Sequence, residues 1–236
     1  MAEIGKNVIE NLTTAMYENA YTVYREYIQN SADSIDKAIA AGIVNEKDAI
    51  IDINIEYNKR RITINDNAMG IPSEMFVKKL TDIADSQKDR TKEKGFRGIG
   101  RLAGVGYCDT LIFKSSYKGE NVESVIEWDG KKLRDVLADT TQHPSASDFV
   151  DDITYSYQNE ANMDEHYFEV IMEGVIPESD DLLDKVAVIE YLESVAPIPF
   201  ATFFIYKSKI YEFCRNNNLK IDEYTIQVNG LSLIHI

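Results

Sequence analysis

Apolar residues in the first part of the chain recur with the spacing of amphipathic helices. This spacing predicts a helix over Ile4–Glu18 and a second helix over Tyr21–Ala41, which Gly42 would end. The core-facing side of the second helix is expected to consist of Tyr24, Ile28, Ser31, Ile35 and Ile39. The opposite side of the same helix is polar, so this one element offers both a core contact and an open surface.

Beyond Gly42, apolar and polar residues alternate as in half-buried strands. The alternation predicts strands over Ile50–Tyr57, Arg61–Asn65, Thr110–Ser115, Asn121–Trp128, His166–Val175 and Tyr224–Ile236. Helical spacing returns in Glu74–Ile83, Lys131–Asp139, Asp180–Glu193 and Phe203–Asn217. The polar segments Asp85–Lys94 and Thr140–Asp152 are expected to be exposed loops. This order predicts an α+β fold, a two-layer α/β sandwich of one mixed, mostly antiparallel sheet with helices on one face.

The two prolines of VAPIPF, Val195–Phe200, would end the last long helix. We therefore expect residues 1–200 to form one domain and residues 201–236 to begin a following domain. The sequence stops within the apolar run NGLSLIHI, and we expect it to be an N-terminal fragment of a longer protein.

The polar side of the second helix carries a regularly spaced set of side chains within REYIQNSADSID. Glu26, Asn30 and Asp33 stand at i, i+4 and i+7, which places them on one stripe over two turns. A carboxylate and an amide at this spacing can hold a water beside a hydrated Mg²⁺, as hydrolysis of a phosphoanhydride requires. The alternative is that the stripe is simply the solvated side of an amphipathic helix.

A second candidate site lies at the end of a predicted strand, in DNAMG. A buried Asp66 there could accept a hydrogen bond from an exocyclic amine, and Gly70 would let the backbone approach a flat ring. An Asx-type turn that ends a hairpin strand explains the same residues equally well.

A glycine-rich segment, GFRGIGRLAGVG, contains Gly95, Gly98, Gly100, Gly104 and Gly106. Successive backbone N–H groups in such a loop can bind phosphate oxygens, although a flexible hinge would have the same composition. The segment lacks Gly-Lys-Ser/Thr and follows no predicted strand, so it is neither a Walker A loop nor a dinucleotide fingerprint. Nearby cations would either form a solvated loop or offset a triphosphate: Lys88, Arg90, Lys92, Lys94, Arg97 and Arg101.

The overall charge and cysteine content narrow the classes of function. A formal net charge of −15 argues against a bulk electrostatic grip on nucleic acid or an anionic membrane. Cys108 and Cys214 match no metal spacing and are expected to be reduced thiols in a cytoplasmic protein. The chain begins without a signal-peptide pattern and has no apolar run approaching about 18 residues. The spacing of the three histidines argues against a zinc site.

In this order, the three candidate segments resemble the boxes of the GHKL superfamily of ATPases, whose nucleotide pocket is the Bergerat fold. REYIQNSADSIDKA resembles the first box, ITINDNAMGIP the second, and GFRGIGRLAGVG the glycine-rich end of the ATP lid. The resemblance covers residues 4–116 and is nearest to the branch of the ninety-kilodalton heat-shock chaperones. Glu26 distinguishes the chain from histidine kinases, which use the pocket to phosphorylate a histidine.

The resemblance implies ATP and Mg²⁺ as cofactors and a role for individual residues. Glu26 would be the general base that orients the attacking water, Asn30 would ligate Mg²⁺, and Asp66 would bind the adenine amino group. Gly98, Ile99 and Gly100 would present backbone N–H groups to the β- and γ-phosphates. The other expected nucleotide contacts are Asp33, Met69, Gly70, Gly95 and Arg97.

The sequence also departs from the family's pattern. Ala68 stands where the second box usually has its first glycine, which would narrow the adenine slot. The family's threonine at the adenine site has no clear counterpart, and Tyr167 or Phe168 falls near its place. The trans-acting lysine or arginine of relatives would come from a second domain.

The resemblance therefore predicts Mg²⁺-dependent binding and slow hydrolysis of ATP in a chaperone-like module. Closure of Asp85–Lys94 over ATP would drive homodimerisation of the full-length protein, which would act on an unidentified client protein. One alternative is a nucleotide-gated scaffold switch with little turnover. Another is a DNA-processing ATPase resembling MutL or a topoisomerase, with DNA contacts supplied by another domain.

Overall fold

The computed structural model describes residues 19–82, 100–139 and 146–235, and these residues form an eight-stranded sheet. The strands lie in the order β5-β4-β3-β6-β2-β1-β7-β8. Their bounds are β1 Ile50–Glu56, β2 Arg61–Asp66, β3 Cys108–Ser116, β4 Val122–Asp129, β5 Thr154–Glu160, β6 Tyr167–Val175, β7 Thr225–Val228 and β8 Leu231–Ser232. Neighbouring strands are antiparallel except for β1 and β7, which are parallel. The prediction of a mixed, mostly antiparallel sheet is confirmed.

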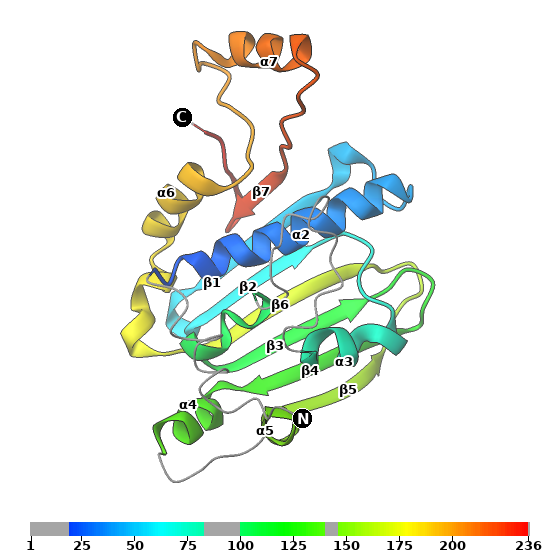
Figure 1. Ribbon diagram of the computed structural model, residues 1–236, viewed down its shortest axis with the longest axis vertical. Coiled ribbons are helices and arrows are strands. Elements are labelled where there is room, and N and C mark those ends of the chain that lie inside the picture. The colour runs from blue at the N-terminus through cyan, green and yellow to red at the C-terminus, as the bar shows by residue number, and fades with distance from the viewer. Residues whose placement is uncertain (1–18, 83–99, 140–145, 236) are drawn as a thin grey trace.

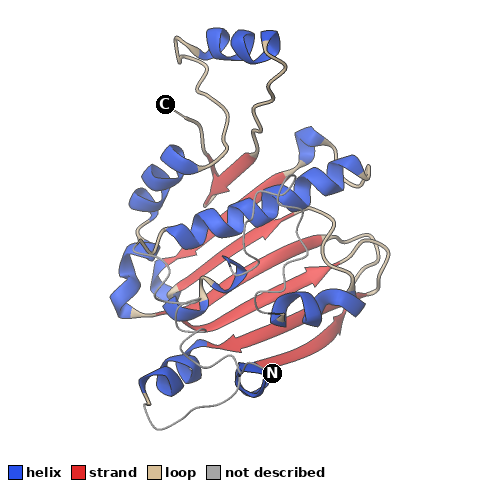
Figure 2. Ribbon diagram, in the orientation of Figure 1, coloured by secondary structure: helices blue, strands red, loops and turns tan. Residues whose placement is uncertain are grey.

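Helices cover one face of this sheet, and Figures 1 and 2 show α2 lying across it. The helices are α2 Thr22–Ala40, α3 Ser73–Thr81, α4 Gly130–Ala138, α5 Ala146–Ile153, α6 Lys185–Val195 and α7 Lys207–Asn216. Short 3-10 segments span Glu46–Asp48, Tyr57–Lys59, Gly100–Leu102, Val105–Tyr107 and Pro177–Leu183. One large apolar core joins the covered face of the sheet to α2, α3, α4 and α6. This arrangement confirms the predicted α+β two-layer fold.

The helix α2 packs as its apolar spacing predicts. Tyr24, Ile28 and Ile35 are fully buried in the main core, and Ser31 is buried beside them. Ile39, which was expected to complete this side, is only half-buried at the end of the helix. Gly42 follows the helix with φ +70°, the left-handed conformation that ends many helices. No helix among the described residues is long and apolar enough to cross a membrane.

The other face of the sheet has a small apolar cluster of its own. Ile112, Val125 and Ile171 form it, with Tyr157 packed against them. These side chains alternate along their strands with residues of the main core, as a two-sided sheet requires. The main core therefore lies on the face of the sheet that the helices cover. Helix α2, which carries the polar stripe, lies on this face as well.

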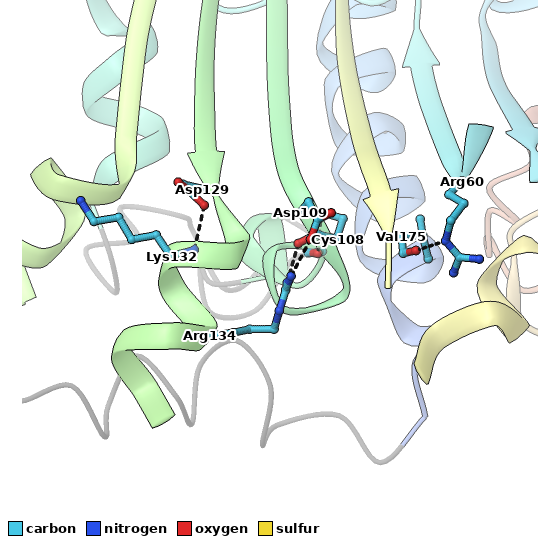
Figure 3. A network of polar contacts seen from close by, with 8 residues as sticks. Arg60, Cys108, Asp109, Asp129, Lys132, Arg134 and Val175 are labelled. Atoms are coloured by element: carbon cyan, nitrogen blue, oxygen red, sulfur yellow. Dashed lines mark hydrogen bonds and ion pairs between the residues drawn. The ribbon is translucent and has the colours of Figure 1, made fainter. Parts of the chain in front are cut away.

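Helix α4 is held against the start of β3 by a polar network (Figure 3). Arg134 donates from Nη1 to the Cys108 carbonyl at 2.6 Å and from Nη2 to Asp109 Oδ1 at 2.7 Å. The carboxylate of Asp129 caps the helix by accepting from the Lys132 N–H at 2.8 Å. A Cβ on Gly130 would lie 2.3 Å from the Cys108 carbonyl oxygen, so this close approach requires glycine.

Two predicted segments are wrong in part. Residues 146–152, which were expected to lie in an exposed loop, belong to α5. The helix expected over Asp180–Glu193 is divided into a 3-10 segment and α6. Asp184 divides it because its side chain accepts from the N–H groups of Val186 at 2.9 Å and Ala187 at 3.2 Å, which caps a new helix.

The end of the sheet also differs from the expectation. The strand predicted over Tyr224–Ile236 is a hairpin of β7 and β8, because Asn229 and Gly230 turn the chain with φ of 48° and 79°. An Asn-Gly pair is the usual signal for such a turn. Strand β5 was not predicted, because its residues are polar or exposed on both sides. The helix expected over Ile4–Glu18 and the loop expected over Asp85–Lys94 lie outside the described residues.

The chain returns to the sheet after residue 200, where a following domain was expected to begin. The Tyr224 hydroxyl lies 2.8 Å and 2.9 Å from the two carboxylate oxygens of Asp36 on α2. The Tyr224 N–H donates to the Pro197 carbonyl at 2.8 Å. These contacts tie the start of β7 to α2, while the division of the chain at residue 200 stays a prediction.

We expect Tyr224→Phe to lower the free energy of unfolding of the whole described domain by about 1–3 kcal/mol, since a buried hydroxyl–carboxylate hydrogen bond is lost. Urea unfolding followed by far-UV circular dichroism would measure the change. Tyr57→Phe is the matched control, because Tyr57 is 58% exposed. A Tyr224→Phe protein as stable as the wild type would show that β7 and α2 do not unfold together.

Candidate functional site

The three stripe residues of α2, Glu26, Asn30 and Asp33, are each at least partly buried. The Glu26 side chain is 18% exposed and has Arg25 Nη2 at 3.5 Å from its Oε1. Asn30 is half-buried, and Asp33 is buried. None of the three side chains is fully exposed, which a purely solvated helix side would require. The functional interpretation of the stripe stays a prediction.

The glycine-rich segment meets the Glu26 carboxylate. A Cβ built on Gly100 would lie 2.0 Å from Glu26 Oε2, so only glycine allows this approach without moving the carboxylate. Glu26 and Gly100 are thus in direct contact although they are more than seventy residues apart in the sequence. The resemblance places them in the first box and in the glycine-rich segment, which would meet at one nucleotide. Gly95, Arg97, Gly98 and Ile99 lie outside the described residues.

Two further side chains hold the residues around Gly100: Tyr27, which sequence reasoning did not select, and Arg101, which it selected only as one of the cations of this region. The Tyr27 hydroxyl donates to the Arg101 carbonyl at 3.1 Å and accepts from the Gly104 N–H at 3.0 Å. The Arg101 guanidinium donates to the Asp82 carbonyl. Burial lowers the pKa of Arg101, with Asp82 opposing the shift. The residues on either side of 83–99 are thereby held together beside α2.

Asp66 at the end of β2 is a buried carboxyl group with one open acceptor. Its Oδ1 accepts from the Ala68 N–H at 3.1 Å, whereas Oδ2 has no hydrogen-bond partner among the described residues. Burial raises the pKa of Asp66 to about 7, and the Ser31 hydroxyl with the Ala68 and Phe168 N–H groups opposes this shift. An unsatisfied buried oxygen of this kind is suited to a donor supplied by a ligand.

The turn after Asp66 is held by the side chains of Asn67 and His166. Asn67 accepts from the Ile50 N–H at 2.9 Å and donates to the Asp48 carbonyl at 2.8 Å. His166 Nδ1 lies 2.7 Å from the Ala68 carbonyl and 3.1 Å from that of Asn67, so this ring nitrogen is a donor. The sequence carries no local signal for His166, because only the pairing of β2 with β6 brings it to this turn.

Gly70 is required by its backbone and by its neighbour. Its φ is +73°, and a Cβ would lie 2.1 Å from the Ser116 carbonyl oxygen of β3. The next residue, Ile71, donates its N–H to Ser115 Oγ at 2.7 Å. Met69 is half-buried and Ala68 is fully buried. That Ala68 narrows an adenine slot stays a prediction.

Phe168 occupies the place across from Asp66. The two residues are partners in the register of β2 and β6, and the Phe168 ring stacks on Phe113 at 5.9 Å between centroids. Tyr167 points its hydroxyl to Glu123 instead. Of the two candidates for the threonine position, Phe168 is the one beside Asp66, and its ring offers the carboxyl no hydroxyl group.

Helix α2 connects the two ends of the candidate site, because it packs against β2, which ends at Asp66, and its Glu26 meets Gly100. A buried acceptor without a partner among the described residues lies at one end, and a carboxylate beside a glycine lies at the other. Among the described residues there is no group of three or more His, Cys, Asp or Glu side chains that could hold a metal ion. The assignment of Mg²⁺ to Asn30 stays a prediction.

Two comparisons with known proteins agree with this geometry. A family model described as histidine kinase-, DNA gyrase B- and HSP90-like ATPase matches residues 17–158. The chaperone protein HtpG of Legionella pneumophila is 30% identical over 145 residues, which cover 53% of this chain and 23% of that protein. HtpG of Coxiella burnetii is 28% identical over 142 residues, or 52% of this chain and 22% of that protein.

The raised pKa of Asp66 predicts how stability depends on pH. The folded protein keeps a proton on Asp66 up to about pH 7, whereas the unfolded chain releases it near pH 4. Raising the pH through this window therefore favours the unfolded state, by up to about 1.4 kcal/mol per pH unit. The free energy of unfolding of Asp66→Asn should not fall in this way, because asparagine does not titrate. We therefore expect the variant to become more stable relative to the wild type as the pH rises from about 4 to about 7.

Urea unfolding of both proteins at several pH values would test this expectation. Asp52→Asn is the matched control, because Asp52 lies exposed on the same hairpin. A stability difference between Asp66→Asn and the wild type that does not change with pH would contradict the raised pKa.

Proposed function

This chain belongs to the family of histidine kinase-, DNA gyrase B- and HSP90-like ATPases, and we propose that its α2–β2 site binds ATP with Mg²⁺ and hydrolyses it slowly. The observation that carries the proposal is the contact between Glu26 and Gly100, on the same helix that packs against β2, whose last residue is Asp66. A base and a phosphate-loop glycine are in contact at one end of the site. A buried acceptor for an amino group lies at the other.

The proposed chemistry depends on position and electrostatics. Asp66 Oδ2 accepts from the adenine amino group, while Met69 and Gly70 line the slot around the ring. Glu26 orients the attacking water and takes its proton. The N–H of Gly100 faces the phosphates, and Mg²⁺ held by Asn30 supplies positive charge for the transferring phosphoryl group. Contacts from Asp33, Gly95, Arg97, Gly98 and Ile99 stay predictions.

The wider function is proposed from the relatives. Two HtpG proteins are named as chaperones, and this chain spans about a quarter of their length. We therefore infer a chaperone-like role in which ATP closes residues 85–94 and drives homodimerisation of a larger protein acting on client proteins. A cytoplasmic location fits the free thiols of Cys108 and Cys214. The charge of −15 does not favour the DNA-processing alternative for this part of the protein.

We expect the wild-type chain to bind ATP with Mg²⁺, and Asp66→Asn to weaken binding by at least about 100-fold, because the amide no longer offers a carboxylate to the adenine amino group. Glu26→Ala should bind ATP as the wild type does and lose turnover by about 100-fold or more. Isothermal titration and steady-state phosphate release measure the two effects, with Asp52→Asn as the control. Equal ATP affinity of Asp66→Asn and the wild type would overturn the assignment of the adenine site.

We expect Gly100→Ala to reduce turnover on the order of 100-fold, because its methyl group would displace the Glu26 carboxylate from its position. The melting temperature should change little, since the added Cβ meets the end of a flexible side chain. A coupled phosphate-release assay and thermal unfolding would separate the two effects. Full turnover in Gly100→Ala would show that the observed position of Glu26 is not the one that catalyses hydrolysis.

A further inference from the structure

Residues 202–223, which we call the arm, leave the domain between α6 and β7 and carry α7 at their far end (Figure 1). Helix α7 has no buried side chain. Five apolar side chains of the arm are each more than half exposed: Phe203, Ile205, Tyr206, Phe213 and Leu219. So many exposed apolar side chains in one short excursion mark a surface that another molecule covers.

The arm is a folded element with fixed contacts of its own. Lys207 Nζ donates to the Phe200 carbonyl at 2.6 Å, and the Leu219 N–H donates to the Cys214 carbonyl at 2.8 Å. The Tyr211 hydroxyl binds the Glu223 carboxylate. At the base, the Ala201 N–H donates to the His235 carbonyl at 2.8 Å, which anchors the arm to the domain. Its surface is therefore preformed.

The arm contains a concavity of about 510 Å³ between α7 and the returning chain. It is lined by Ser208, Tyr211, Cys214, Arg215, Leu219, Lys220 and Ile221. Its apolar lining and basic side chains suit an apolar group that stands next to a carboxylate. Lys220 is paired with Asp222 at 3.2 Å, whereas Arg215 has no ion pair within the described part of the chain. Arg215 is thus the cation that can receive the carboxylate.

The same chain presents such a pair of side chains on α6. Val186 is 65% exposed and Glu190 is exposed four residues later, so they lie side by side on the outer surface of the helix. Val188 and Leu192 face the core from the opposite side. The surrounding segment is strongly acidic, with Glu178, Asp180, Asp181, Asp184, Glu190 and Glu193 against the single cation Lys185. The arm carries the basic residues Lys207, Lys209, Arg215 and Lys220 and the acidic residues Glu212, Asp222 and Glu223, so its net charge is slightly positive.

We propose that the arm of one copy of this chain docks on α6 of a second copy, with Val186 in the concavity and Glu190 against Arg215. Each copy carries both surfaces, so two copies can make the same contact twice. A closed two-fold dimer requires such a repeated contact. Helix α7 stands away from α6 of its own chain (Figures 1 and 2). A second copy is favoured over other partners because the complementary charge and the apolar knob are both present on this chain.

This dimer does not depend on nucleotide, which separates it from the ATP-driven dimerisation of the proposed function. Light scattering during size-exclusion chromatography, without ATP, should show a dimer that dissociates on dilution and in high salt. Glu190→Lys and Arg215→Glu should each raise the dissociation constant by about tenfold or more, since each reversal acts twice in a two-fold dimer. The double variant should recover most of the affinity.

Glu46→Lys and Lys47→Glu are the matched controls, since both residues are exposed in a 3-10 segment that belongs neither to α6 nor to the arm. Asp66→Asn should leave the dimer intact even where it abolishes ATP binding. A wild-type chain that is monomeric at high concentration would overturn the proposal. A dimer that both charge reversals leave unchanged, or that the double variant does not restore, would also overturn it.

A covalent test uses the native Cys214 of the concavity. We expect Val186→Cys to form a disulfide-linked dimer under mild oxidation, seen on a non-reducing gel, because the new thiol enters the concavity of the partner copy. The combination of Val186→Cys with Cys214→Ser should lose this product. A covalent dimer that persists in the combined variant, or none in Val186→Cys alone, would show that α6 and the concavity do not meet.

Discussion

The packing of α2 across the sheet is the contact on which the rest of the structure depends. One side of this helix carries Tyr24, Ile28 and Ile35 into the main core, so its rotation about its own axis is fixed by burial. The direction in which the opposite side of the helix faces is thereby fixed. Glu26 on that side has to meet the glycine-rich segment, while the core side, which includes Ser31, packs against the strand that ends at Asp66. The site is therefore set by the same contacts that stabilise the fold.

The order of the strands in the sheet fixes the other end of the candidate site, at the turn after Asp66. Strand β6 lies between β3 and β2, so it brings His166 and Phe168 to the turn that follows Asp66. Strand β3 brings Ser115 and Ser116 to Gly70. The turn is thus held from two strands, while Tyr27 and Arg101 hold Gly100 from the side of α2. Such support keeps a site in place before any ligand arrives.

The sequence predicted those parts of the fold that depend on local periodicity and short motifs. The strand hairpin at Ile50–Asp66 and the helix α2 follow from regular alternation and helical spacing, and the two-layer arrangement follows from their order. Glu26, Asp66 and Gly100 were selected because each has a motif around it. The break at Asp184 and the turn at Asn229 carried recognisable signals that the overall periodicity concealed.

Other features could not be predicted, because they depend on contacts between distant residues. His166 acquires its role only through the pairing of β2 with β6, and Arg101 only through the carbonyl of Asp82. Strand β5 is mostly polar, and its only aromatic residues, Tyr155 and Tyr157, alternate over too short a stretch to predict a strand. It pairs with β4, and Tyr157 packs against the small apolar cluster.

The environment of Asp66 connects this architecture to the proposed chemistry. Phe168 places an aromatic ring beside Asp66, which is itself buried. Burial favours the protonated form, and the pKa of Asp66 rises to about 7. An adenine amino group is a donor and favours the ionised form. On the proposed function, nucleotide binding therefore releases a proton near neutral pH, and the burial of Asp66 couples ATP affinity to pH.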